Sequence, residues 1–192
     1  KPNVQLLLTG NELMTGDIVD SNSAMIAQQF KELGLDISRK VTIADDLELL
    51  VKEINHLAQH ADILIINGGL GPTIDDLTAQ ALAKATKTEL TEHSEALVHL
   101  TNWCKNRGAP LNAPNLKQTM LPKGCDIIAN RQGSAVGFKL NHTACDIYCT
   151  PGVPRELQTM LIEQIVPDIA NKLPNKLITD VTRLQVFGLG ES

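Results

Sequence analysis

The order of the predicted elements indicates an α/β protein built on a doubly wound, mostly parallel sheet. Apolar runs typical of buried strands cover residues 4–9, 36–43 and 62–67. Each run is followed by an amphipathic helical pattern, over residues 22–33, 47–60 and 79–86. Strands that alternate with helices in this way form parallel pairs joined by right-handed crossovers, which is why the sequence predicts this fold class.

Individual residues justify the helices of this first half. The first helix places Ile26, Phe30 and Leu33 on one face, and Gly34 closes it. The second helix has an apolar stripe formed by Leu47, Leu50, Val51, Ile54 and Leu57. Both helices therefore have a face to bury against the sheet.

Beyond Glu92 the regular alternation ends. Helical patterns occur at residues 94–107 and 113–120, and strand patterns at residues 126–129, 135–140 and 146–150. A turn at residues 140–143 predicts that the last two strands form a hairpin. Pro154 suits the first turn of a further helix, which ends near Ile165 or Leu173.

The end of the chain differs in character from the rest. A boundary near residues 174–176 is expected to close a domain that covers residues 1–173. Residues 174–192 would begin a linking region or a C-terminal strand, with strand pattern at residues 179–187. The final residues have the character of a truncated chain.

Composition excludes several classes of function. The chain has 192 residues, 43% of them hydrophobic and 20% charged, which is typical of a globular domain with a sizeable core. The net charge of −5 disfavours nucleic-acid binding, and no apolar run approaches the ~20 residues that a membrane span needs. Because its start lacks a signal-peptide pattern, the chain is expected in the cytoplasm.

The cysteines do not predict a metal centre or a redox pair. The sequence contains Cys104, Cys125, Cys145 and Cys149, and no two of them form a C-x-x-C pair. His142 is the only imidazole near them, which disfavours a zinc site. We therefore expect small, buried thiols in a reducing compartment.

Loops of functional character follow several of the predicted strands, at residues 9–13, 67–78 and 150–156. Loops at the carboxyl ends of parallel strands meet at one crevice of a doubly wound sheet. We therefore expect a single site to which these loops contribute together.

The glycine turn, residues 67–78, has two interpretations. Its glycines allow the backbone to approach an anion, and the helix that follows adds a partial positive charge. The turn lacks the G-x-G-x-x-G and G-K-[ST] fingerprints, so Gly68, Gly69 and Gly71 also fit a purely conformational turn from strand to helix. In that second interpretation Asp75 or Asp76 caps the helix.

The acids beside this turn would repel a phosphate, and a divalent cation would resolve the conflict. One of Asp45 and Asp46 is expected to cap the second helix, while the other could point towards Asp76 across the crevice. Two carboxylates at neighbouring strand ends can hold a metal ion, with water in the remaining positions. Such an ion would polarise a phosphoryl oxygen or activate a water molecule.

Other polar residues also have a structural alternative. Ser21 or Asn22 fits a helix cap, although Asn22 could also reach a ligand. Residues 133–137 could pass close to a ligand or form a β-bulge or turn. His56 and His60 have a metal-ligand spacing, but they lie away from the strand-end loops and are expected to face solvent.

Taken together, these motifs resemble one known family. The matching stretches follow the family's order and are Thr9–Leu13, Gly16–Asn22, Asn67–Thr78, Gly133–Gly137, Thr150–Glu156 and Phe187–Ser192. The chain resembles the N-terminal domain of the competence/damage-inducible CinA family, which is similar to molybdopterin-binding domains of molybdenum-cofactor biosynthesis. The resemblance implies a three-layer αβα, molybdopterin-binding-like fold for residues 1–173.

The resemblance also implies an activity. It implies an ADP-ribose pyrophosphatase, a hydrolase that splits ADP-ribose into AMP and ribose 5-phosphate with a divalent metal ion (Mg, Mn, Co or Ni). In related pterin enzymes the glycine turn and its aspartate handle a phosphate, and a second aspartate precedes the second helix. These positions match Asp76 and Asp45, which are therefore expected to be catalytic and to bind the metal.

The residues expected to bind the substrate come from the same motifs: Gly10, Glu12, Asn22, Gly68, Gly69, Leu70, Gly71, Pro72, Thr73, Asp75, Thr78, Ser134, Gly137, Pro151, Gly152, Pro154 and Glu156. One departure from the family is Asn11, where many relatives have Asp, so a catalytic role is doubtful there. Longer members continue into a domain that deamidates nicotinamide mononucleotide, and that activity is not assigned to this chain. The resemblance alone suggests a homodimer.

Two further hypotheses remain open beside the pyrophosphatase. The chain could be a module that binds a pterin phosphate or transfers a nucleotidyl group. It could also be a non-catalytic paralogue that retains the fold for interaction. Nucleotide turnover that requires both a metal and Asp76 would favour the pyrophosphatase over these alternatives.

Overall fold

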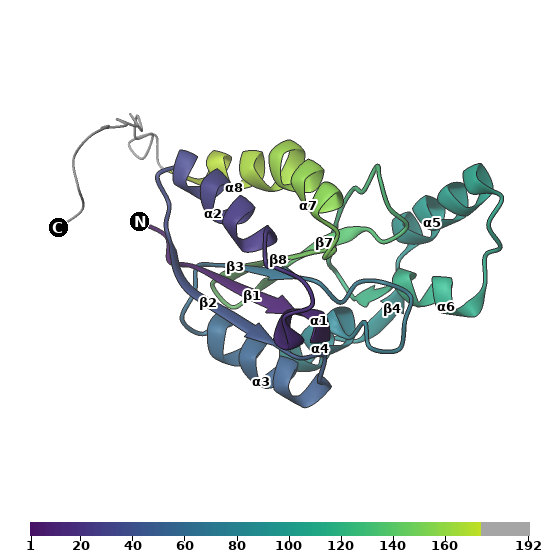
Figure 1. Cartoon of the computed structure of the whole chain (residues 1–192), viewed down its shortest axis with the longest axis horizontal. Helices are drawn as coiled ribbons and strands as arrows, with labels where there is room; N and C mark the ends of the chain where they lie inside the picture. Colours follow the sequence, from purple (N-terminus) through teal and green to yellow (C-terminus); the bar gives the residue numbers. More distant parts are fainter. Residues whose placement is uncertain (174–192) are drawn as a thin grey trace.

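The computed structural model describes residues 1–173, which form a mostly parallel sheet between two layers of helices (Figure 1). The sheet has the strand order β2-β1-β3-β8-β7-β6. Its strands are β2 (Ile37–Ile43), β1 (Val4–Thr9), β3 (Ile63–Asn67), β8 (Cys145–Thr150), β7 (Gly137–His142) and β6 (Asp126–Ile128). Neighbouring strands from β2 to β8 are parallel, whereas β7 and β6 pair antiparallel. The predicted fold class is therefore confirmed.

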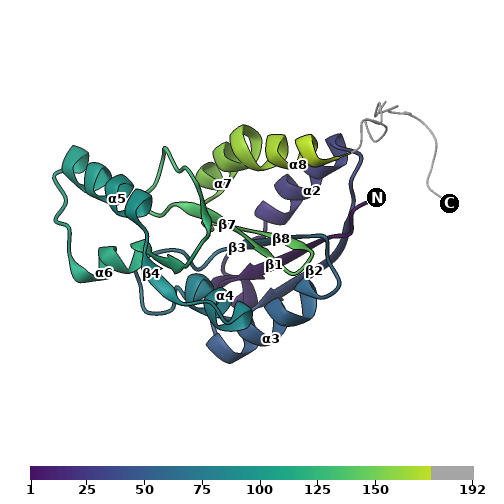
Figure 2. The same ribbon diagram turned by 180° about the vertical axis from the view of Figure 1, so that it is seen from behind.

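Helices cover both faces of this sheet, as both views show (Figures 1 and 2). One face is covered by α2 (Asn22–Glu32), α7 (Pro154–Met160) and α8 (Val166–Lys172). The other face is covered by α3 (Leu47–Ala58) and α4 (Thr78–Thr86). Because helices cover both faces, the loops at the ends of the strands are the accessible parts of the sheet.

The two-residue period of a strand explains how the central strands serve both layers. Leu6 and Leu8 of β1 pack in an apolar cluster with Phe30 of α2. Leu7 points the other way and packs in a second cluster with Leu50 of α3. All of these side chains are fully buried, so each layer has its own core on either side of β1 and β3.

A smaller lobe lies at one end of the sheet (Figures 1 and 2). It contains α5 (Ser94–Arg107), α6 (Ala113–Leu116), a 3₁₀ turn (Lys117–Thr119) and the antiparallel pair β4 (Leu90–Glu92) and β5 (Met120–Pro122). The prediction of one helix over residues 113–120 was wrong at its end. Met120 pairs with Glu92 instead, because strand pairing with a distant segment outweighs the local helical pattern.

The β7–β8 hairpin and the final helix refine two other predicted boundaries. The turn predicted at residues 140–143 was placed too early, because β7 continues to His142, which pairs with Cys145. Thr143 takes the left-handed conformation of the turn, with φ of 57°. Of the two predicted ends for the last helix, the later one is right. A π-helical turn (Leu161–Ile165) joins α7 to α8 just before Pro167, which lacks an N–H donor.

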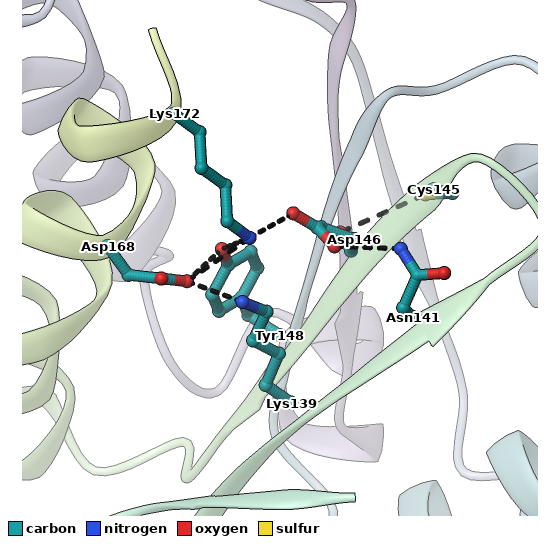
Figure 3. Close-up of polar contacts among 7 residues, drawn as sticks. All are labelled: Lys139, Asn141, Cys145, Asp146, Tyr148, Asp168 and Lys172. Atoms are coloured by element: carbon teal, nitrogen blue, oxygen red, sulfur yellow. Dashed lines mark hydrogen bonds and ion pairs between the residues drawn. The ribbon is translucent and has the colours of Figure 1, made fainter.

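Charged groups fasten α8 to the β7–β8 hairpin (Figure 3). Asp168 accepts hydrogen bonds from the Tyr148 hydroxyl at 2.6 Å and from Lys139 Nζ at 2.7 Å. Lys172 donates to Asp146 on β8. Burial and the neighbouring Asp168 carboxylate raise the pKa of Tyr148 well above its ordinary value, so the phenol stays a donor.

Several expectations concern parts of the chain beyond these elements. The predicted strand over residues 179–187 and the boundary near residues 174–176 lie outside the described residues. None of the helices formed by residues 1–173 has both the length and the apolar character needed to cross a membrane. All cysteines are buried free thiols, as predicted.

Candidate functional site

A crevice with a volume of about 580 Å³ lies at the carboxyl ends of β1, β3 and β8. The loops that follow these strands line it together. Gln118 of the smaller lobe, and Ser134 and Ala135 of the segment that leads into β7, complete the lining. The arrangement follows from the parallel order of the strands, which places their carboxyl ends at one edge.

The loop after β1 is held in place by Asp45. The Thr9 hydroxyl donates to Asp45 Oδ1 at 2.6 Å, and the Asn11 N–H donates to Asp45 Oδ2 at 3.0 Å. Asp46 points elsewhere and caps α3 by accepting from the Leu49 N–H at 2.8 Å. Of the two acids, Asp45 is therefore the one that lines the crevice.

The glycine turn needs glycine for its own conformation. Gly68 and Gly69 have φ of 108° and 66°, a region that side chains disfavour. A Cβ at Gly69 would lie 2.5 Å from Thr78 Oγ1, and one at Gly68 would collide with the backbone oxygen of Thr9. The N–H groups of Gly69, Leu70 and Gly71 donate to no group within residues 1–173. Glycine is thus required for the conformation of this turn, and the turn also leaves backbone N–H groups available to a ligand.

The acids of this turn accept hydrogen bonds from Thr73 within the turn and not from the first N–H groups of α4. Asp76 Oδ2 accepts from the Thr73 N–H at 2.9 Å and from its hydroxyl at 2.6 Å. Asp75 accepts from the same hydroxyl, and this hydrogen bond lowers the pKa of Asp75. The N-cap of α4 is Leu77, without a side-chain cap. The alternative in which Asp75 or Asp76 caps the helix is therefore wrong.

Two buried amides tie three of the walls together. Asn22 Nδ2 donates to Asn67 Oδ1 at 2.9 Å and to the Gly152 carbonyl at 2.7 Å. Asn67 Nδ2 donates in turn to Thr150 Oγ1 at 3.1 Å and to the Pro151 carbonyl at 2.7 Å. The amides thereby link α2, β3 and the loop after β8. Sequence reasoning did not single out Asn67 as a functional residue.

Ser21, one of the two predicted caps, occupies the N-cap position of α2, but the side-chain hydrogen bonds there are made by Asp20. Asp20 accepts from the Ser23 N–H at 2.9 Å and from its hydroxyl. Neither Ser21 nor Asn22 caps the helix through its side chain, because Ser21 makes no cap bond and Asn22 bonds to Asn67 and Gly152. Asn22 is free of the capping role and lines the crevice.

Glu156 lines the crevice from α7, and its carboxylate is held by Asn130. Asn130 Nδ2 donates to Glu156 Oε2 and to the Ala135 carbonyl, both at 2.7 Å. Asn130 Oδ1 accepts from the N–H groups of Gln132 and Gly133. Burial raises the pKa of Glu156, although the Asn130 hydrogen bond opposes this. The bonds to Oδ1 form a local Asx turn, whereas the contact with Glu156, 26 residues away, could only be found from the tertiary structure.

The other predicted residues divide into two groups. Those that line the crevice are Gly10, Glu12, Leu70, Gly71, Pro72, Ser134, Pro151, Gly152 and Pro154. Thr78 and Gly137 are not among the lining residues. Thr78 is fully buried and donates to the Gly68 carbonyl at 2.8 Å, whereas a Cβ at Gly137 would lie 2.8 Å from the Cys149 carbonyl. Thr78 therefore holds the glycine turn from its buried side, whereas Gly137 lets β7 pack closely against β8.

The prediction of a divalent metal between Asp45 and Asp76 stays a prediction. Residues 1–173 contain no group of three or more His, Cys, Asp or Glu side chains able to hold a metal ion. Both carboxylates line the crevice, but Asp45 already accepts hydrogen bonds at both oxygens. The donor set therefore fits a cation held by at most two protein carboxylates. His56 and His60 lie outside the crevice lining, on α3 and beyond its end.

Solved structures of known proteins share this fold. Protein CinA from Thermoplasma acidophilum, whose function is unknown, is 29% identical and superposes with a TM-score of 0.80 over 88% of this chain and 98% of its own. The molybdopterin biosynthesis enzyme MoaB from Thermus thermophilus is 15% identical, with a TM-score of 0.58 over 92% and 100% of the two chains. At that identity the second likeness shows the fold alone.

Curated relatives extend the comparison to full-length proteins. A CinA-like protein from Colwellia psychrerythraea is 72% identical over 100% of this chain and 44% of its own length. Nicotinamide-nucleotide amidohydrolase PncC from Shewanella oneidensis is 38% identical over 98% of this chain and 45% of its own length. The chain therefore spans less than half the length of the curated relatives it matches.

These relatives correct the expected activity. The sequence-based expectation of ADP-ribose pyrophosphatase activity was wrong, because the activity named among the relatives is that of a nicotinamide-nucleotide amidohydrolase. An amidohydrolase cleaves a C–N amide bond, whereas a pyrophosphatase cleaves a P–O bond.

A family model described as "Probable molybdopterin binding domain" matches residues 5–171, which is nearly all of the described structure. The match includes every loop that lines the crevice. The chain therefore belongs to the molybdopterin binding domain family and, within it, to the CinA-like proteins.

Proposed function

We propose that this chain acts in the hydrolysis of the amide of a nicotinamide nucleotide, and that the crevice binds that nucleotide. The observation that supports the proposal is the crevice itself, in which loops from separate strands surround about 580 Å³. Sites for small molecules commonly have volumes of about 300–1,000 Å³. The choice of nucleotide rests on the name of the Shewanella oneidensis relative.

The glycine turn suits the phosphate of such a nucleotide. The N–H groups of Gly69, Leu70 and Gly71 have no acceptor within residues 1–173. Backbone N–H groups next to a helix start bind phosphate oxygens, because the donors point outward and the helix dipole favours negative charge. We place the phosphate at these groups and the rest of the nucleotide along the crevice.

Hydrolysis of a carboxamide requires a group that moves protons. Water attacks the carbonyl carbon, the C–N bond breaks, and both protons of the water end on the leaving nitrogen, so that a carboxylate and an ammonium ion are formed. Glu156 is suited to this transfer because burial raises its pKa towards the range where a carboxyl group can both accept and donate a proton. No cysteine is among the residues that line the crevice, so the cysteines are not placed to act as nucleophiles there. Burial also raises the pKa of Cys125 to about 11 and that of Cys145 to about 12.

Ammonia release from nicotinamide mononucleotide tests the hydrolytic part. We expect release by the chain and a loss of at least about 100-fold in Glu156→Gln, which keeps the shape but cannot move a proton. Glu163→Gln is the matched control, because Glu163 is exposed on the same helical run and pairs with Arg131. Binding without ammonia release would contradict hydrolysis by this chain and leave the binding role.

Calorimetry with ribose 5-phosphate tests the phosphate site and the predicted metal together. Without metal, Asp76→Asn is expected to strengthen binding about threefold, because it removes a repelling charge beside the glycine turn. If a divalent ion joined Asp76 to the phosphate, the same substitution would weaken binding in Mg²⁺. No binding of ribose 5-phosphate under either condition would contradict the phosphate site.

A further inference from the structure

The glycine turn combines donors for an anion with acids that repel one. The N–H groups of Gly69, Leu70 and Gly71 have no acceptor within residues 1–173. Asp75 and Asp76 follow in the same turn, and both line the crevice. No lysine, arginine or histidine of the described part of the chain lines the crevice itself. A phosphate at these N–H groups therefore needs a positive charge nearby to offset the two carboxylates.

A second, smaller cavity places a positive charge beside the same turn. It has a volume of about 150 Å³, with the glycine turn on one side and residues of the smaller lobe on the other. Gly69, Leu70 and Gly71 line both this cavity and the crevice, so the two spaces share the turn as a common wall. Lys117 of the 3₁₀ turn lines the smaller cavity, and no other basic residue among residues 1–173 lines either space.

The ammonium group of Lys117 is held at the turn. Lys117 Nζ donates to the Thr73 carbonyl in a contact that is open to solvent. The hydrogen bond from Thr73 lowers the pKa of Asp75, and the charge of Lys117 adds to this effect. Both observations place the ammonium group next to Thr73 and Asp75.

This ammonium group also keeps donors for a ligand. A lysine ammonium has three N–H bonds. Among the hydrogen bonds formed by the described residues, only the one to Thr73 uses Lys117 Nζ. Lys117 forms no ion pair with any carboxylate of residues 1–173. Two of its N–H bonds are therefore available to an acceptor that a ligand brings.

The segment that carries Lys117 is fixed by its own contacts. Gln118 and Thr119 are 7% and 1% exposed. Gln118 Nε2 donates to Ser134 Oγ at 3.1 Å, and Thr119 Oγ1 donates to the Leu116 carbonyl at 2.7 Å. The base of the Lys117 side chain is consequently held in place, so less conformational entropy is lost when its ammonium group binds a ligand.

We propose that Lys117 is the cation by which this protein binds a phosphate at the glycine turn. The inference rests on the part of the proposed function that places a phosphate there, and it identifies the residue that offsets Asp75 and Asp76. Lysine is a common phosphate ligand, because its compact ammonium charge pairs with phosphate oxygens. Phosphate binding at this turn then needs no divalent metal ion.

Calorimetric titration with two phosphates tests the proposal. Inorganic phosphate and ribose 5-phosphate are each titrated into the parent chain and into Lys117→Gln, in EDTA, at low and at high salt. We expect Lys117→Gln to weaken binding about tenfold at low salt. The difference should narrow at high salt, because salt screens a charge that is open to solvent. Lys117→Arg, which keeps the charge, should restore most of the affinity.

Two controls separate ligand binding from bracing of the turn. Lys123→Gln removes the same charge from an exposed position of the smaller lobe, where Lys123 pairs with Glu89 at 3.8 Å, and should leave the affinities unchanged. In NMR spectra of the labelled chain, the N–H signals of Gly69, Leu70 and Gly71 should shift when phosphate is added. At the same phosphate concentration these shifts should be much smaller in Lys117→Gln.

The possible outcomes distinguish this inference from the proposed function. If the parent chain and Lys117→Gln bound ribose 5-phosphate equally well, the role of Lys117 would be overturned, whereas the phosphate site would stand. An affinity loss that is the same at low and high salt would also overturn it, because Lys117 would then only brace the turn. Binding that requires Mg²⁺ and does not depend on Lys117 would assign the positive charge to a metal ion instead. If neither phosphate bound under any condition, the phosphate site of the proposed function would fail together with the inference.

Discussion

Asn130→Ala is expected to destabilise the fold and to change the titration of Glu156. Asn130 is 2% exposed, and its amide donates to Glu156 Oε2 and to the Ala135 carbonyl at 2.7 Å each. Its oxygen accepts from the N–H groups of Gln132 and Gly133 at 2.9 and 3.0 Å. The substitution therefore removes hydrogen bonds both within the loop of residues 130–135 and between that loop and Glu156 on α7.

The magnitude follows from those partners. A neutral hydrogen bond contributes about 1 kcal/mol, and one to a charged group contributes about 1.5–3 kcal/mol. Water that enters the vacated space recovers part of this loss. We therefore expect the free energy of unfolding to fall by about 3–5 kcal/mol. Because the carboxylate also loses a donor that favours its charged form, the pKa of Glu156 should rise further.

Urea unfolding and NMR titration of the Glu156 carboxyl group measure the two effects. Asn141→Ala is the control, because Asn141 is exposed and makes one bond, to Asp146 at 3.0 Å. Its loss should be below about 1 kcal/mol. If Asn130→Ala lost as little stability as the control and left the pKa of Glu156 unchanged, the role of Asn130 in holding the Glu156 carboxylate would be refuted.

Other predictions use different measurements. Gly68→Ala should lower the melting temperature far more than Gly124→Ala, since both have positive φ but only the Cβ at Gly68 meets a backbone oxygen; similar losses would contradict the steric argument. Tyr148→Phe should reduce stability in thermal unfolding by about 1–3 kcal/mol, because Asp168 loses a donor at 2.6 Å, and no change would show that this bond is replaced by water. The raised pKa of Glu156 means that the folded state holds its proton more tightly than the unfolded state. Its contribution to stability is therefore full below the ordinary pKa of 4.5 and is lost as pH rises through the higher folded value. Glu156→Gln should therefore flatten the dependence of the unfolding free energy on pH in this range. Parallel pH profiles of the variant and the parent chain would contradict this expectation.

Sequence patterns predicted the elements of the fold that depend on local information. Buried strands at β1 and β3 are recognisable because most of their residues are apolar, as is typical of strands covered on both faces. The β4–β5 pair escaped prediction, since Leu90–Glu92 and Met120–Pro122 are short and acquire their strand conformation only from each other. Local propensity has no information about such a distant partner.

The candidate site shows the same division. Asp45 and the glycine turn could be named from the sequence because each directly follows a strand, and the edge where parallel strands end is fixed by their order. The cap of α4 was misassigned, and at α2 the predicted Ser21 takes the N-cap position while Asp20 makes the side-chain bonds. Asp76 and Asp20 have several possible donors nearby in the sequence, and only the folded backbone decides among them.

The sequence by itself determined the doubly wound order of strands and helices and the place where their loops meet, because both follow from periodicity and chain direction. Only the tertiary structure decided which polar groups face one another there. Asn67 and Asn130 meet partners up to 84 and 26 residues away, so their roles depend on distances that no local pattern contains. The clustering of acids in the crevice is likewise a property of the assembled walls, since these acids come from separate loops.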